Sequence, residues 1–193
     1  IAILLKNNAY RFTGVNKREL LWEAHLKISK THIQEHIVTL FKTEKINYKT
    51  PQLTSSDLEN AFDEIELLGF PLCNPFDLLE NQSSSPLRAN QLLSYKNKTI
   101  TIEGYLVTTK NTGTSNGKRM FFGTFLDRDG NFIDTVHFPP VATKFPFRGK
   151  GVYSINGKVI EEFDCINIEV IFMKKLAVVE DPRYSDKIKP ITA

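Results

Sequence analysis

Between residues 98 and 176, short apolar runs alternate with breaks at Gly, Asn and Asp. The runs are TITIEGYLVTTK, RMFFGTFLD, FIDTVHF, GVYSINGKVI and INIEVIFMKKL. They are rich in β-branched and aromatic residues, and turn residues separate them at a spacing of roughly 8–12 residues. This pattern predicts five β-strands that close, or nearly close, into a small antiparallel barrel.

The number of strands narrows the choice of barrel. Five strands favour an OB-fold over a β-sandwich, which normally has about seven. Pro139 and Pro140 end the third run, and the segment from there to Arg148 lies where an OB-fold connects its third and fourth strands. Gly104, inside the first run, is the expected site of a bulge or bend.

Helical patterns precede the barrel. Asn16 is placed to cap a helix that begins at Lys17, and Ser56 with Glu59 forms a capping-box pattern that Gly69 would end. We therefore predict an α+β protein, with an N-terminal helical segment followed by a five-stranded antiparallel OB-fold barrel. The expected divisions are residues 1–30 (helical), 31–56 (linker), 57–97 (connector helix and loop), 98–176 (barrel) and 177–193 (tail).

The second strand of the barrel is apolar on both faces. Met120, Phe122 and Leu126 would lie on one face, and Phe121 and Phe125 on the other. One set must form the core, and the other then needs a partner. The pattern alone does not decide which set is which.

Charge is distributed unevenly along the chain. The net charge is +3, residues 1–50 carry nine Lys and Arg against four Glu, and residues 57–66 carry five acids and no base. Lys17 and Arg18, in the first turn of a helix, would suit a phosphate group, and the alternative is a solvated basic helix start. The acidic run is expected to be a solvated helix face.

Other sequence features argue against catalysis and cofactors. Cys73 and Cys165 have no CxxC partner, so we expect buried cysteines without zinc or a disulfide. Asp127, Asp129 and Asp134 surround a turn, where acids are common, and no P-loop, HExxH or nucleophile-elbow motif occurs. We predict no catalytic residue, no metal site and no cofactor in this fragment. The opening IAILL is too short for a signal peptide or a membrane span.

Several segments resemble the C-terminal region of the bacterial DNA polymerase III alpha subunit, in the form typical of the Bacteroidetes lineage. They include DEIELLGFPLCNPFDLL, GYLVTTK and GKGVYSINGKV, and the resemblance covers nearly all of the chain. In that family a helix-hairpin-helix region, a sliding-clamp-binding peptide, an LLG-type connector and an OB-fold follow in this order. The resemblance implies a non-catalytic fragment of a nucleotidyltransferase, acting in DNA replication in the bacterial cytoplasm at the nucleoid. Residues 1–30 would be the tail of the helix-hairpin-helix region and would contact duplex phosphates through Lys17 and Arg18.

The peptide HIVTLF, residues 36–41, resembles the clamp-binding peptides of the family. Val38, Leu40 and Phe41 match the pattern, Ile37 stands where the family has Gln, and Leu40 and Phe41 would be the anchors. The alternative is an apolar segment of the linker that folds back on the helices. If the match holds, the sliding clamp and the rest of the polymerase holoenzyme are partners.

For the barrel, the resemblance implies contact with the single-stranded template. Bases would stack on aromatic side chains while a basic groove follows the phosphates. The turn at residues 161–164 is acidic, so contact should favour the side from Lys110 to Arg119. His137 has the alternative of a hydrogen-bonded barrel residue, and the whole barrel has the alternative of a protein-interaction module that contacts the clamp or clamp loader without DNA. The candidate residues are Tyr105, Lys110, Lys118, Arg119, Phe121 and His137.

Overall fold

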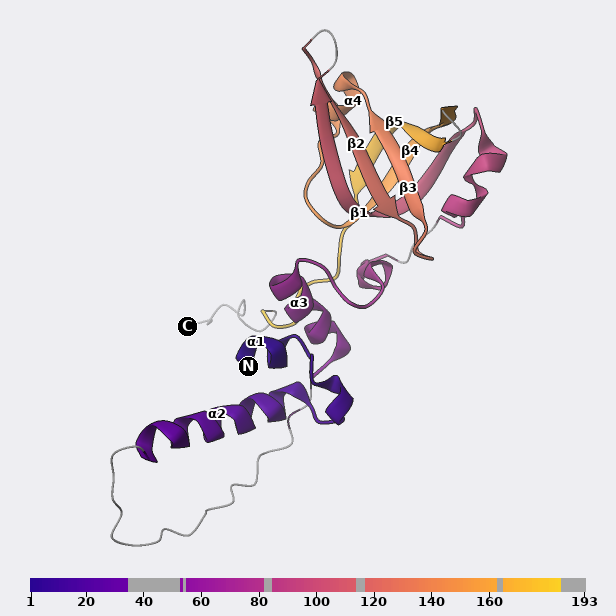
Figure 1. The fold of residues 1–193 in the computed structure, drawn as a ribbon. Coiled ribbons are helices and arrows are strands. Elements are labelled where there is room, and N and C mark those ends of the chain that lie inside the picture. The colour runs from indigo at the N-terminus through magenta and orange to yellow at the C-terminus, as the bar shows by residue number, and fades with distance from the viewer. Residues whose placement is uncertain (35–52, 54, 82–84, 114–116, 163–164, 185–193) are drawn as a thin grey trace, which may run out of the picture. The chain divides into compact units, whose positions relative to one another are not determined.

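The computed structural model describes residues 1–34, 53, 55–81, 85–113, 117–162 and 165–184 (Figure 1). The chain forms two units: Ile1–Pro71 together with Asp181–Ala193, and Leu72–Glu180. We call them the helical unit and the barrel unit and describe each by itself. The boundary at Pro71 falls inside the segment 57–97, so that segment contributes to both units.

The barrel unit is an OB-fold, as predicted. Its strands pair in the order β1-β2-β3-β5-β4 and close into a barrel (Figure 1). The closing pair β3–β5 is parallel and the others are antiparallel, so the barrel is mixed rather than wholly antiparallel. A short helix, α4 (Pro139–Lys144), follows β3 in the predicted connection. The strands are β1 (Thr99–Gly113), β2 (Arg119–Leu126), β3 (Phe132–His137), β4 (Val152–Glu162) and β5 (Cys165–Lys175).

The core of the barrel takes one residue set from each strand. Each strand, from β1 to β5 in turn, contributes a fully buried side chain: Ile102, Phe125, Ile133, Ile155 and Ile168. Because side chains alternate along a strand, burial of Phe125 places Met120, Phe122 and Leu126 on the outer face of β2. The face of β2 that carries Phe121 and Phe125 is therefore the core face, which the sequence pattern left open.

A phenylalanine from the connection between α4 and β4 fills the barrel beside this core. The ring centroid of Phe147 lies 4.7 Å from that of His137, 6.1 Å from that of Phe121 and 6.3 Å from that of Phe125. Gly123 makes room for the ring: a Cβ atom there would lie 3.0 Å from Phe147 Cζ and 2.8 Å from Thr135 Oγ1. The glycine is therefore required by packing.

The irregularity of β1 is not where the sequence predicted it. The pairing of β1 with β2 shifts register between Leu106 and Thr108, whereas Gly104 pairs regularly with Tyr153. Gly104 instead allows close approach, since a Cβ atom there would lie 2.8 Å from Phe125 Cβ. The predicted bulge at Gly104 was wrong because a small residue in a strand serves packing as well as bending.

Short 3₁₀ turns cover part of the outside of the barrel. η2 (Pro75–Leu78) and η3 (Ala89–Tyr95) both precede β1. Phe76 and Leu79 pack with Val152 and Tyr105 in a second apolar cluster. This cluster therefore buries one part of the outer surface of the barrel.

The helical unit contains α1 (Ala2–Lys6), the turn η1 (Arg11–Thr13), α2 (Lys17–Gln34) and α3 (Asp57–Leu68). Asn16 Oδ1 accepts a hydrogen bond from the Arg18 N–H at 2.9 Å, which caps α2. The Ser56 capping box and the Gly69 stop are both confirmed. Helix α2 continues to Gln34, beyond the predicted boundary at residue 30.

The acidic run of α3 is not a solvated face, contrary to the prediction. Lys17, which is only 5% exposed, forms an ion pair with Asp63, and Arg18 forms one with Glu59 at 2.9 Å. Arg183 lies 2.6 Å from an Asp63 oxygen. The acids therefore bind to distant cations, a pairing that the sequence pattern does not show.

Two smaller expectations concern the cysteines and the membrane. Cys73 and Cys165 are both exposed, so the expectation that they are buried was wrong. In the portion of the chain that the structure covers, no helix combines the length and apolar character needed to cross a membrane.

Candidate nucleic-acid interface

The outer face of β1, β2 and β3 carries an exposed aromatic and basic surface. Phe122 pairs directly with Lys110 on β1 and with Val136 on β3, so the three side chains form one row across the sheet. Phe122 is 40% exposed. Further along, Phe132, which is 66% exposed, pairs with Leu126 on the same face. We call this surface the outer platform: Lys110, Phe122, Thr124, Leu126, Phe132 and Asp134, together with Val136, which is buried.

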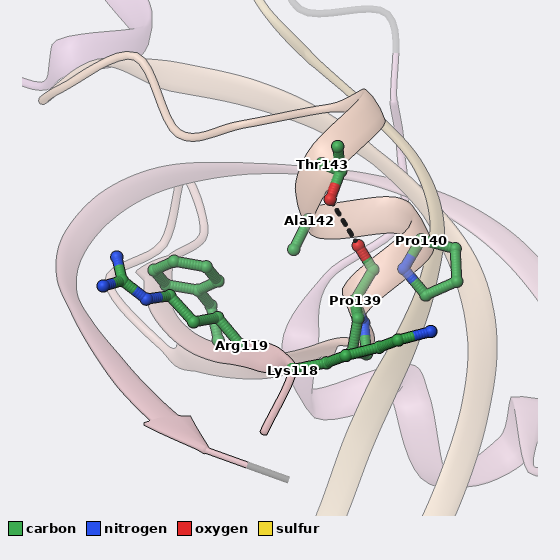
Figure 2. Close-up of a pocket in the computed structure, with 7 residues that line it drawn as sticks. Lys118, Arg119, Pro139, Pro140, Ala142 and Thr143 are labelled. Atoms are coloured by element: carbon green, nitrogen blue, oxygen red, sulfur yellow. Dashed lines mark hydrogen bonds between the residues drawn. The ribbon is translucent and has the colours of Figure 1, made fainter. Parts of the chain in front are cut away.

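A groove of about 580 Å³ lies between the start of β2 and α4 (Figure 2). The side chains of Lys118 and Arg119 extend in opposite directions (Figure 2), because they are successive residues. Two prolines at the start of α4 form the other wall, and Thr143 Oγ1 donates to the Pro139 carbonyl at 2.9 Å. We call it the α4 groove, lined by Lys118, Arg119, Phe121, Pro139, Pro140, Ala142 and Thr143.

His137 lies inside the barrel. It has no exposed surface, its Nε2 is 2.9 Å from Thr135 Oγ1, and its ring packs on Phe147. Burial lowers the pKa of His137 to about 4, so the ring is neutral at pH 7. The structure thus corresponds to the second alternative of the sequence analysis, a hydrogen-bonded barrel residue, and His137 is not presented to a base.

Among the aromatic candidates, the predicted Phe121 and the overlooked Phe122 have opposite orientations. Phe121 pairs with His137, shares the inner face with Phe125, and is half-buried where the barrel meets the α4 groove. Phe122 faces outward beside Lys110. Phe121 lies four residues before the buried Phe125 and so shares its face, but the sequence did not reveal which face was the core.

The remaining predicted DNA contacts divide between exposed and packed residues. Lys110, Lys118 and Arg119 are exposed. Tyr105 packs against Phe76, Leu79 and Val152, and burial raises its pKa. Lys110 therefore belongs to the outer platform and Lys118 and Arg119 to the α4 groove, while Tyr105 belongs to neither surface.

Two further groups of predicted residues lie away from the barrel. Lys17 and Arg18 are engaged by Asp63 and Glu59, and their contact with duplex phosphates stays a prediction. Ile37, Val38, Leu40 and Phe41 lie outside the described residues. The clamp-binding role of this peptide likewise stays a prediction.

The acids around the β2–β3 turn have structural partners. Asp127 accepts hydrogen bonds from the N–H groups of Ala89 at 2.9 Å, Asp129 at 2.9 Å and Asn131 at 2.8 Å. Burial raises the pKa of Asp127, but these hydrogen bonds outweigh it and the net pKa is lowered. Asp127 therefore holds the turn and the start of η3. Within the described ranges, no three His, Cys, Asp or Glu side chains gather as a metal site would require.

Comparison with known proteins adds a fold-level likeness. No family model and no curated protein matches the sequence. Among solved structures, the chain is similar to the second OB-fold domain of replication protein A from Methanococcus maripaludis, with 18% identity, a TM-score of 0.33, and 44% of this chain and 91% of that chain covered. It is also similar to a small single-stranded DNA-binding protein from Streptomyces coelicolor, with 12% identity, a TM-score of 0.33, and 42% and 93% covered.

A third similar structure is a putative nucleic acid-binding lipoprotein from Klebsiella pneumoniae, with 16% identity, a TM-score of 0.37, and 46% of this chain and 78% of that chain covered. Likenesses of this size do not transfer a function. The function is therefore inferred from the outer platform and the α4 groove.

Proposed function

We propose that the OB-fold binds single-stranded nucleic acid across the outer platform and the α4 groove. One observation carries this proposal: Phe122 is exposed on the sheet, directly opposite Lys110 in register. An exposed aromatic ring beside a cation offers a base a stacking surface and its phosphate a counter-charge. The neighbouring Lys118 and Arg119 at the start of β2 would continue the basic path.

The spacing of aromatic residues fits more than one base. Phe122 and Phe132 share the outer face, and Leu126, the partner of Phe132, lies four residues beyond Phe122. At about 3.3 Å per residue, the two rings start roughly 13 Å apart along the sheet. That distance leaves room for an extended strand to place different bases on the two rings.

Acidic groups near this surface are partly engaged. Asp134, between the two aromatic residues, accepts a hydrogen bond from Thr124 Oγ1 at 2.8 Å. The acidic residues of the β4–β5 connection are expected to repel phosphate. One of them, Glu161, forms an ion pair with Lys96. These contacts reduce the repulsion of a phosphate backbone, although they do not remove it.

We further propose that the chain is the C-terminal region of a replicative DNA polymerase alpha subunit, with the barrel guiding template and residues 37–41 docking on the sliding clamp. The sequence resemblance supports this proposal, and the OB-fold at the expected place in the chain agrees with it. In this role the fragment contributes binding, and the polymerase reaction belongs to the parent enzyme.

Anisotropy of a fluorescent oligothymidylate tests strand binding by the full chain. Phe122→Ala is expected to weaken binding by about tenfold, since stacking contributes ~1–3 kcal/mol per base. Phe70→Ala, a similarly exposed Phe of the helical unit, is the matched control. Unchanged affinity in Phe122→Ala would refute the platform.

A second pair of variants separates the DNA-binding and protein-interaction alternatives. Replacing both Lys118 and Arg119 by Gln should weaken binding and reduce the dependence of log affinity on log salt, because fewer counterions are released. Lys158→Gln is the control. If neither affinity nor salt dependence changes, the α4 groove does not contact the strand.

Clamp docking has its own measurement. Leu40→Ala with Phe41→Ala should abolish retention of the chain on an immobilised sliding clamp, because two apolar anchors supply most of the energy of such a peptide. Oligothymidylate binding by the same variant should be unchanged. Undiminished retention would exclude this peptide as the docking site.

A further inference from the structure

The barrel unit contains a second cleft, of about 460 Å³, whose lining residues differ from those of the outer platform. On the outer face of β1, β4 and β5, Glu103 pairs with Ser154, and Ser154 pairs with Lys174, so the three form one row across the sheet. The row lies beside the cleft. We call it the β5 cleft, lined by Asn81, Glu103, Arg148, Lys174, Lys175, Leu176 and Ala177.

Three cations line the β5 cleft. Lys175 Nζ donates to the Arg148 carbonyl at 3.0 Å, so the end of β5 is tied to the segment before β4. Across the ranges covered by the structure, neither Arg148 nor Lys174 takes part in an ion pair. Cations that line one cleft and take part in no ion pair favour an anion, and phosphate is one of the anions that Arg and Lys bind.

A carboxylate in the same cleft, that of Glu103, requires a hydrogen-bond donor rather than an anion. Glu103 is only 8% exposed, and its Oε2 atom has no hydrogen-bond partner among the residues described. A buried carboxylate oxygen without a donor is costly, and a simple anion would repel it. A ligand that suits the whole cleft must therefore bring both an anionic group and hydrogen-bond donors.

We propose that the β5 cleft binds a nucleotide, with the phosphate held by Arg148 and Lys174 and the base edge read by Glu103. A purine or pyrimidine edge is read by hydrogen bonds to its donors and acceptors. Guanine fits Glu103 best, because its N1–H and 2-amino group are adjacent donors. Thymine fits worst, because two carbonyl oxygens flank its only ring N–H and would face the carboxylate.

This inference goes beyond the proposed strand binding, since the one carboxylate of the outer platform, Asp134, is exposed and already accepts a hydrogen bond from Thr124 Oγ1. The volume of the cleft lies within the range of small-ligand sites. The β5 cleft would add a preference for guanine to a domain whose platform binds any base. The same chemistry could come from a free nucleotide or from a guanine within a strand.

Calorimetry of the full chain with dGMP, dTMP and inorganic phosphate tests the proposal. We expect dGMP to bind about tenfold more tightly than dTMP, the size of discrimination that one bidentate base contact provides. Phosphate alone should bind more weakly than dGMP. Equal affinity for the three ligands, or no binding of dGMP, would overturn the proposal.

Two variants assign the roles within the cleft. Glu103→Gln preserves shape and should remove the dGMP preference while dTMP binding is kept or strengthened. Lys174→Gln should weaken dGMP and dTMP by the same factor. Lys158→Gln and Glu169→Gln, a cross-strand pair on β4 and β5, are the controls for charge. A dGMP preference that survives Glu103→Gln would refute the base-reading role.

Three further measurements address the stability of Glu103→Gln, the independence of the β5 cleft from the platform, and the source of the nucleotide. Glu103→Gln removes a buried charge without a donor, so its melting temperature should not fall, and a fall would show that Glu103 serves stability instead. Phe122→Ala should weaken oligothymidylate binding and leave dGMP binding intact, which distinguishes failure of the β5 cleft from failure of the platform. An oligothymidylate with one central guanine should bind more tightly than the parent oligonucleotide only if the cleft accepts a guanine within a strand.

Discussion

The barrel unit and the helical unit are stabilised by different kinds of interaction. The barrel buries apolar residues from all five strands around Phe125 and Phe147. In the helical unit, the described residues include few buried apolar side chains, such as Leu5 and Ala61, while Phe12 is 80% exposed. There, Lys17 and Arg183 join segments distant in sequence through carboxylates of α3. We therefore expect substitutions, pH and salt to affect the two units differently.

The largest expected effect is loss of the core ring in the barrel. Phe125→Ala should lower the free energy of unfolding of the barrel by about 3–5 kcal/mol, because it removes a fully buried aromatic ring. Urea unfolding measures this change by circular dichroism, while fluorescence of Trp22, the single tryptophan, follows the helical unit. An equal shift of both signals would contradict the separation of the units.

The second effect concerns acid and the buried histidine. The pKa of His137 is lowered from 6.5 to about 4, so between these values the unfolded chain binds a proton that the folded barrel excludes. Stability of the barrel should therefore fall as pH falls from 6.5 to 4, by up to about 1.4 kcal/mol per pH unit. Urea unfolding across this range measures the slope.

His137→Gln supplies the control for that slope, because glutamine does not titrate. The helical unit should respond at lower pH. The hydrogen bond from Arg183 holds the pKa of Asp181 below its usual 3.8, so this contribution is present above that pH and is lost as pH falls through the lowered pKa. A slope at pH 4–6.5 that persists in His137→Gln would assign it to another group.

The third and smaller effect is loss of the Arg183 ion pairs. Arg183→Gln should destabilise the helical unit by about 1–2 kcal/mol, since it removes charged hydrogen bonds to Asp63 and Glu66. The loss should shrink in 1 M salt, where the Debye length is about 3 Å. Trp22 fluorescence during urea unfolding measures both.

Arg128→Gln removes a more exposed ion pair, with Asp77, in the barrel unit and should change stability by less than about 1 kcal/mol. If both variants lose the same free energy of unfolding, the ion pairs of α3 contribute no more to stability than an exposed ion pair does.

The sequence predicts the architecture better than it predicts the surfaces. Strand runs and turn residues are local signals, so the five strands and the Ser56 capping box could be predicted, and Gly69 ended α3 as expected. The choice between Phe121 and Phe122 could not be predicted, because both faces of β2 are apolar and only the closed barrel shows which one is inner.

Contacts between distant segments explain the remaining errors. Lys17 finds Asp63 across 46 positions, and Phe147 enters the barrel from a connection with no strand or helix pattern. The β5 cleft unites Glu103 with Arg148 and Lys174 from three separate segments. No local periodicity predicts such contacts, because they depend on how segments distant in sequence pack together.

The close fit of Phe147 over Gly123 has a consequence for the divergence of related sequences. A Cβ atom at position 123 would lie within 3.0 Å of the Phe147 ring. An alanine at 123 therefore requires Thr135 Oγ1, Phe125 Cε2 and the Phe147 ring to shift, and single changes at 123 and 147 should not add. Among homologues the two positions should covary, although 24 residues separate them in the chain.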